Sequence, residues 1–143
     1  MKAADLRIGN LVNYTDDTCV CTISELYSKQ VGVDVITHFR VFPPNPVSIV
    51  NIGGIRLTDY WMKLLGFSKN GAVWEETFHL PGMFINREGN SFYLQSDTNN
   101  YINKEPLSFV HEIQNLYHAI TRKDIETDTD KIEIALNDSY LKL

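Results

Sequence analysis

The sequence contains very little cysteine and no long apolar run, and both absences exclude classes of protein. Only two cysteines occur among 143 residues, which argues against a disulfide-rich secreted scaffold. No window approaches the roughly 20 apolar residues that a membrane-spanning helix needs. The first residues also lack the apolar core of a signal peptide. We therefore expect a cytoplasmic protein that does not associate with a membrane.

Basic residues are also scarce, and this argues against a duplex nucleic-acid partner. The 13 Lys and Arg residues are outnumbered by 18 Asp and Glu residues, which gives a net charge of −5. A protein that binds duplex nucleic acid needs a surplus of cations to displace the counterions of the phosphates. The composition, with 43% hydrophobic and 22% charged residues, is typical of a folded globular chain.

The chain lacks the short motifs that mark common catalytic and cofactor sites. It contains neither the glycine-rich phosphate loops nor the G-x-S-x-G turn of a serine hydrolase. Glu126, Asp128 and Asp130 fit the first positions of a calcium loop, but Lys131 stands where glycine is required and Asn137 where glutamate is required. We expect no enzymatic activity, no cofactor and no metal site.

Cys19 and Cys21 are predicted to be structural residues rather than ligands. Two residues apart on a strand, their side chains share one face and cannot easily form a disulfide with each other. A zinc site would need two further ligands at suitable spacing, and no second pair exists. The pattern favours two small core residues in a reducing compartment.

The first third of the chain is typical of a small antiparallel sheet. Residues 6–14 begin an alternating apolar pattern that Gly9-Asn10 interrupts, which predicts a bulge or tight bend. Further β-branched and aromatic runs occupy 18–23, 31–36 and 38–42. Together they predict a strongly bent sheet of SH3-like type, before the prolines at 43–46 end any strand pairing. Residues 49–52 predict one more short strand.

A short helix and a second β region follow. Thr58 is a natural N-cap and Gly66 a natural left-handed stop, so we expect a helix at Thr58–Leu65. Runs at 73–78, 83–86 and 92–95, separated by turn residues, predict strands.

The most regular pattern predicts a long amphipathic helix at Leu107–Thr121. The apolar residues at helical spacing are Phe109, Val110, Ile113, Leu116, Tyr117 and Ile120. We expect the opposite face to carry His111, Asn115, His118 and Arg122, either solvated or facing a partner. Histidines seven residues apart do not have the i, i+4 spacing of a metal pair.

The organisation that follows is α+β: twisted antiparallel sheets, one short helix and one long helix. We predict a single domain at 1–126, with an N-terminal β subregion at 1–42 and β strands plus helices at 47–126. Residues 127–143 are expected to be a C-terminal tail or exchanged arm. Its 131–136 segment alternates in part, as an edge strand would, and could join chains into a homo-oligomer.

Three phrases carry a family resemblance: DLRIGNLV near the start, IRLTDYWMKLLGF in the middle and FVHEIQNLYHAIT near the end. They resemble, in the same order, a family of small uncharacterised proteins encoded by Bacteroidetes genomes and their phages or prophages. Relatives carry phrases such as LRIGNLV, PLTEEWLLKFGF and VHELQNLYFALTG. This chain departs from the pattern at Arg122, where the family phrase commonly turns through a glycine. The resemblance implies a phage or mobile-element accessory protein in a bacterial host and transfers no catalytic residue.

The function that these observations favour is non-enzymatic binding. The sharpest version is interference with host defence, either by sequestering a signalling nucleotide or by blocking a host protein. The alternatives are an SH3-like adapter that binds protein or single-stranded nucleic acid, and a structural assembly component. Aromatic and basic residues are suitable contacts for such ligands. The candidate contact residues are Arg56, Trp61, Trp74, Arg87, Tyr93, His111, Asn115, His118 and Arg122.

Overall fold

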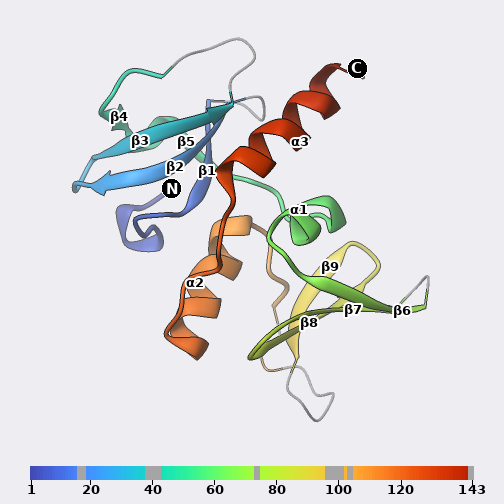
Figure 1. The fold of residues 1–143 in the computed structure, drawn as a ribbon. Helices are drawn as coiled ribbons and strands as arrows, with labels where there is room; N and C mark the ends of the chain where they lie inside the picture. The colour runs from blue at the N-terminus through green and yellow to red at the C-terminus, as the bar shows by residue number, and fades with distance from the viewer. Residues whose placement is uncertain (16–18, 38–42, 73–74, 96–101, 103–104, 142–143) are drawn as a thin grey trace. The chain divides into compact units, whose positions relative to one another are not determined.

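The computed structural model describes residues 1–15, 19–37, 43–72, 75–95, 102 and 105–141. The chain divides into two compact units (Figure 1). Unit 1 combines Met1–Ile55 with Thr127–Leu143, and unit 2 is Arg56–Glu126. The division lies between Ile55 and Arg56, and unit 1 takes in the segment that the sequence suggests is a tail or exchanged arm.

Unit 1 is built on a five-stranded antiparallel sheet in the order β4-β3-β2-β1-β5. Strand β1 pairs with both β2 and β5, so the last strand of this sheet returns along the chain to lie beside the first. That arrangement suits a strongly bent sheet, although the SH3-like assignment stays a prediction. The elements are η1 (Ala3–Asp5), β1 (Leu11–Tyr14), β2 (Val20–Leu26), β3 (Gln30–Thr37), β4 (Val47–Ser48), η2 (Ile49–Asn51) and β5 (Ile52–Gly54).

The predicted break in the first apolar pattern is confirmed at Gly9-Asn10. Gly9 has a φ of +93°, a conformation that glycine adopts without steric cost. The Asn10 side chain accepts a hydrogen bond from the Arg7 backbone N–H at 2.7 Å. The tight bend before β1 is therefore stabilised by Gly9 and Asn10, the residues that interrupt the apolar alternation.

The core of unit 1 lies on one face of this sheet. Cys19 and Cys21 are fully buried there, with their sulfur atoms 3.8 Å apart, which confirms their assignment as core residues. Burial and the neighbouring Cys19 sulfur raise the pKa of the Cys21 thiol far above its ordinary value. The Cys21 thiol is therefore protonated and chemically unreactive at neutral pH.

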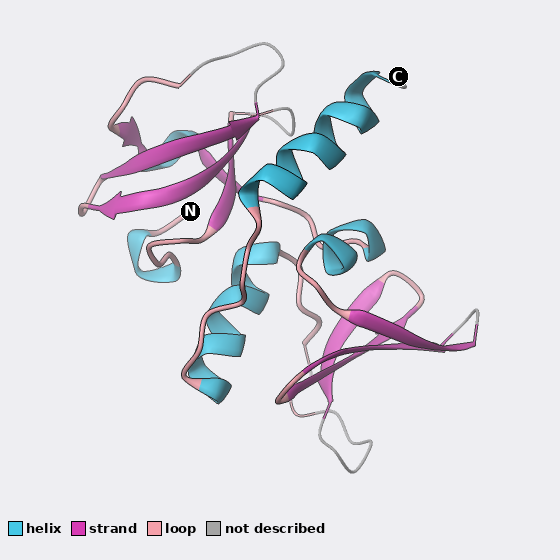
Figure 2. Cartoon of the chain, in the orientation of Figure 1, coloured by secondary structure: helices cyan, strands magenta, loops and turns pink. Residues whose placement is uncertain are grey.

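The prediction of a strand at 131–136 is wrong. Residues Thr129–Leu141 form helix α3, which packs against β3 (Figures 1 and 2). Ile132 and Leu136 are buried, whereas Ile134 is 66% exposed. The Thr37 hydroxyl of β3 donates a hydrogen bond to the Asn137 side chain at 2.8 Å. The segment therefore belongs to unit 1 as a packed helix.

Unit 2 contains a four-stranded antiparallel sheet of successive hairpins, in the order β6-β7-β8-β9 (Figure 1). A short helix precedes the sheet and a long helix follows it. The elements are α1 (Asp59–Leu64), β6 (Ser68–Ala72), β7 (Glu75–Leu80), β8 (Met83–Glu88), β9 (Ser91–Gln95) and α2 (Val110–Thr121).

Both predicted helices are present, and the fold class is α+β as expected. The Thr58 hydroxyl caps α1 by accepting a hydrogen bond from the Trp61 N–H at 3.2 Å, and Gly66 has a φ of +92° after it. The long helix starts three residues later than predicted because Leu107 donates its N–H to the Phe92 carbonyl at 2.7 Å. That bridge holds Leu107 beside β9 in extended form.

Strand β6 is an element that the sequence pattern does not reveal. The predicted strand at 38–42 lies outside the described residues, and so do the first two residues of the one predicted at 73–78.

Within the ranges that the structure describes, no helix has the length and apolar character needed to cross a membrane.

Candidate functional site

The candidate site is a pocket of about 450 Å³ in unit 2. Its lining comes from the segment before α1, the start of α1, strands β8 and β9, and the turn between those strands. The lining residues are Arg56, Leu57, Thr58, Asp59, Tyr60, Arg87, Asn90 and Phe92.

The register of the sheet places Arg87 in this pocket. Arg87 on β8 stands opposite Phe92 on β9, and residues directly opposite in an antiparallel pair share one face. The other wall is fixed by backbone pairing, because Arg56 forms a β-bridge with Phe109 and the Leu57 N–H donates to the Ser108 carbonyl at 2.9 Å.

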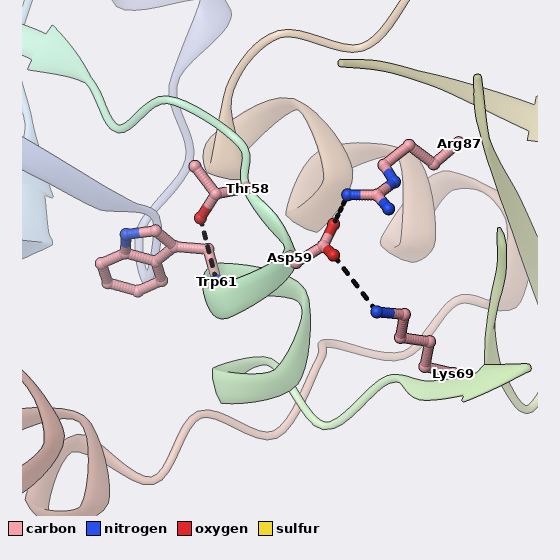
Figure 3. A network of polar contacts seen from close by, with 5 residues as sticks. All are labelled: Thr58, Asp59, Trp61, Lys69 and Arg87. Atoms are coloured by element: carbon pink, nitrogen blue, oxygen red, sulfur yellow. Dashed lines mark hydrogen bonds and ion pairs between the residues drawn. The ribbon is translucent and has the colours of Figure 1, made fainter. Parts of the chain in front are cut away.

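Asp59 connects the helix to the strands through two cations (Figure 3). One of its carboxylate oxygens lies 2.7 Å from an Arg87 guanidinium nitrogen on β8, and the other lies 3.3 Å from the Lys69 ammonium on β6. The three side chains are between 22% and 32% exposed, so water screens the pairs only in part. The Arg87 guanidinium is therefore held in position at the pocket.

The charges around the pocket sum to a positive value in an acidic protein. Among the lining residues, Arg56 and Arg87 bring two positive charges to the single negative charge of Asp59, which also pairs with Lys69 outside the lining. Arg56 is exposed and forms no ion pair with any residue in the described ranges. A site with this balance attracts an anion, and a planar guanidinium can bind phosphate or carboxylate through two hydrogen bonds.

The remaining lining supplies polar atoms and an aromatic face. Tyr60 is 41% exposed, and Asn90 is exposed in the turn between β8 and β9. Phe92 is buried and contributes apolar surface. The one carboxylate in the lining is already ion-paired, and the Thr58 hydroxyl caps α1. The arrangement is therefore suited to binding a ligand through charge, hydrogen bonds and stacking.

Two of the sequence-predicted contact residues, Arg56 and Arg87, line this pocket together. Tyr93 does not, because it stands opposite Asn86 in the register and so points to the other face of the sheet. Trp61 is only 6% exposed, which corrects its prediction as a surface contact: it shares a helix face with the buried Leu64 and Leu65, three and four residues further on. Trp74 lies outside the described residues.

The four predicted residues of the long helix do not form a common surface, and none lines the pocket. The prediction that His111 is solvated is wrong, since the residue is 5% exposed. Its ring stacks on that of Phe109, with the ring centroids 5.7 Å apart. His118 is half-buried and pairs with Asp124 at 3.0 Å. Asn115 is half-buried, and Arg122 is exposed at the end of α2.

Sequence reasoning missed the parts played by Asp59 and Asn90. Asp59 is indicated only as a favourable charge at a helix N-terminus, and Asn90 only as a turn residue. Their place in one pocket depends on the hairpin register and on the packing of α1, which no local pattern records.

No family model, no curated protein and no solved structure matches this chain. Within the described ranges, no three histidine, cysteine, aspartate or glutamate side chains lie close enough together to hold a metal ion.

Proposed function

We propose that this protein binds a small phosphorylated nucleotide in the pocket of unit 2 and acts by sequestering it. The observation that carries the proposal is the convergence of Arg56 and Arg87 on one cavity, with Tyr60 and Asn90 beside them. A volume of about 450 Å³ falls within the range of small-molecule sites.

Each part of a nucleotide has a suitable partner in the lining. The ion pair with Asp59 at 2.7 Å already holds the Arg87 guanidinium in one orientation, so binding a phosphate costs little further conformational entropy. Arg56 can add a second contact to the same or a neighbouring phosphate. The exposed ring of Tyr60 offers a surface on which a base can stack, and the Asn90 amide can hydrogen-bond a base edge.

The biological role is that of a phage or mobile-element accessory protein that interferes with host defence. This part of the proposal is supported by the family resemblance of the three sequence phrases. Removing a signalling nucleotide requires only tight binding and no catalytic step. Blocking a host protein is the alternative within the same role.

The test is isothermal titration and thermal shift with a panel of mono-, di- and cyclic nucleotides. We expect at least one nucleotide to raise the melting temperature, because a ligand that binds only the folded state stabilises it. Arg56→Ala should lower the affinity for that nucleotide about tenfold or more, since charged hydrogen bonds contribute roughly 1.5–3 kcal/mol.

Lys123→Ala is the matched control, because it removes one exposed positive charge of unit 2 that does not line the pocket. It should bind the nucleotide as the unchanged protein does. If no nucleotide shifts the melting temperature, or if both variants weaken binding equally, the proposed site is wrong and a protein partner becomes the better explanation.

A further inference from the structure

The outer edge of strand β3 in unit 1 is only partly paired. Strand β4 matches β3 at Gln30 and Val31 alone, whereas β3 continues to Thr37. Beyond Val31, no described strand lies along this edge. Unpaired strand edges present backbone donors and acceptors to any extended chain that approaches them.

The peptide groups of Val33 and Val35 face this open edge. Ile23, opposite Val33, uses its own N–H and carbonyl on the β1 side, with Asn10 and Gly9. Ile23 and Val33 are therefore a non-hydrogen-bonded pair, and the Val33 peptide groups point outward. The Val33 N–H donates to the Asn45 side-chain oxygen at 3.3 Å, as that orientation requires. The Val35 peptide groups, two residues further along β3, have the same outward orientation.

A groove of about 480 Å³ runs along the same edge, lined by residues 33–36 of β3, Pro43, Asn45 and Glu133 of α3. Asp34 and Glu133 are exposed, and neither forms an ion pair with any residue that the structure describes. The groove thus combines outward backbone groups, apolar side chains and two unneutralised carboxylates.

We propose that this groove binds an extended, lysine-bearing segment of a partner protein, which pairs with the outer edge of β3. Main-chain hydrogen bonds to Val35, and to Val33 in place of the Asn45 amide, would supply the affinity of an added strand. Lysine side chains would lie near Asp34 and Glu133 and select the partner. The site is in unit 1 and does not depend on the nucleotide pocket of unit 2.

The charge of the groove identifies this occupant rather than a second copy of the chain. Two β3 edges paired around a two-fold axis would bring two Asp34 carboxylates to one ribbon, and facing like charges destabilise a strand pair. The whole chain carries a net charge of −5, which also disfavours self-association and favours a basic partner.

The test uses the full chain, isotopically labelled, with an acetylated octapeptide of alternating valine and lysine as the probe. We expect its addition to shift the backbone amide resonances of Val33 and Val35 and to slow hydrogen exchange at Val35. Two matched peptides, one with glutamate in place of lysine and one with N-methylated central amides, should bind at least tenfold more weakly.

Asp34→Asn combined with Glu133→Gln should weaken binding of the lysine peptide by up to about fivefold for each carboxylate, the upper end of what a solvent-exposed ion pair contributes. The control pair Asp130→Asn and Asp138→Asn makes the same charge change outside the groove and should leave the affinity unchanged. The peptide comparisons on the unchanged protein decide the matter if the variants fold poorly.

The proposal is overturned if the lysine peptide does not bind, if it binds without moving the Val35 resonance, or if the two variant pairs weaken it equally. It is also overturned if light scattering shows a dimer in which hydrogen exchange at Val35 is already slow before the peptide is added, because β3 would then pair with a second copy.

Discussion

Arg122 has a backbone conformation that is sterically unfavourable for any residue with a side chain. It ends α2 with a φ of 63°, and its N–H bonds to the His118 carbonyl at 2.8 Å. Glycine is the residue that adopts this left-handed conformation without steric cost. Arg122 therefore ends the helix in a geometry to which glycine is better suited.

We therefore expect Arg122→Gly to stabilise unit 2. Relief of the left-handed strain outweighs the greater entropy of glycine in the unfolded chain, for a net gain of about 0.5–1 kcal/mol. Urea unfolding followed by tryptophan fluorescence measures the change. Lys123→Gly, at a neighbour without positive φ, should instead lower the free energy of unfolding, and a gain there would contradict the explanation.

The buried thiol of Cys21 gives a second prediction at this scale. Its pKa is raised in the folded state above the ordinary value of 9.0, first by burial and then by Cys19. Above about pH 9 only the unfolded chain releases this proton, so the stabilising effect of the protonated thiol is progressively lost. Below that pH both states are protonated, so the effect is fully present and this group adds no pH dependence to the free energy of unfolding.

We expect the free energy of unfolding to fall above pH 9 by up to about 1.4 kcal/mol per pH unit more than in Cys21→Val. The measurement is urea unfolding of both proteins between pH 8 and 10.5. Parallel pH dependences would show that Cys21 ionises in the folded state as it does in the unfolded chain.

The candidate site could be predicted from sequence only in part, and the reason is visible in its two arginines. Arg56 and Arg87 were suitable cations for an anion-binding site, but many other residues were equally suitable. Their meeting in one pocket depends on the β8–β9 register and on the backbone bridge to Phe109. These are non-local pairings that no short window of sequence contains.

At the scale of elements, α3 shows why a pattern can predict the wrong structure. Ile132, Ile134 and Leu136 alternate as in a half-buried strand, yet Ile132 and Leu136 alone also fit the i, i+4 spacing of a helix. The structure selects the helical spacing and leaves Ile134 exposed. Asp128 supplies the start signal by accepting a hydrogen bond from the Lys131 N–H at 3.1 Å. The N-cap and glycine stop that flank α1, and the longer apolar repeat of α2, carried no such ambiguity.

The two isoleucines of α3 provide a matched test. Ile132→Ala should lower the free energy of unfolding by about 2–5 kcal/mol, because it removes a fully buried side chain and leaves a cavity. Ile134→Ala, on the exposed side of the same helix, should change it by no more than about 0.5 kcal/mol. Denaturant unfolding followed by circular dichroism distinguishes them, and equal losses would favour the strand that the sequence suggested.

At the scale of the whole molecule, the chain has two compact units with separate sheets and a natural probe for each. Both cysteines lie in unit 1, and both tryptophans lie within the sequence range of unit 2. Thiol accessibility therefore reports the opening of unit 1, while tryptophan fluorescence reports on unit 2. The sequence did not reveal this division, because prolines at 43–46 mark a stronger local boundary than the residues at 55–56.

We expect Ile132→Ala to lower the denaturant midpoint of cysteine exposure by more than that of tryptophan fluorescence, because the lost side chain belongs to unit 1. Pulsed thiol labelling and fluorescence on the same samples measure both midpoints. Equal shifts would show that the two units unfold as one cooperative body.

The return of α3 to β3 has a consequence for how the protein is made. The hydrogen bond between Thr37 and Asn137 joins residues 100 positions apart, with all of unit 2 synthesised between them. A ribosome adds roughly 5–20 residues per second, so the first sheet must wait several seconds for the helix that completes it. Unit 2 is continuous and can fold in that interval. The part of the protein translated first is therefore the part finished last, and the nascent N-terminal sheet is where a chaperone would have most to protect.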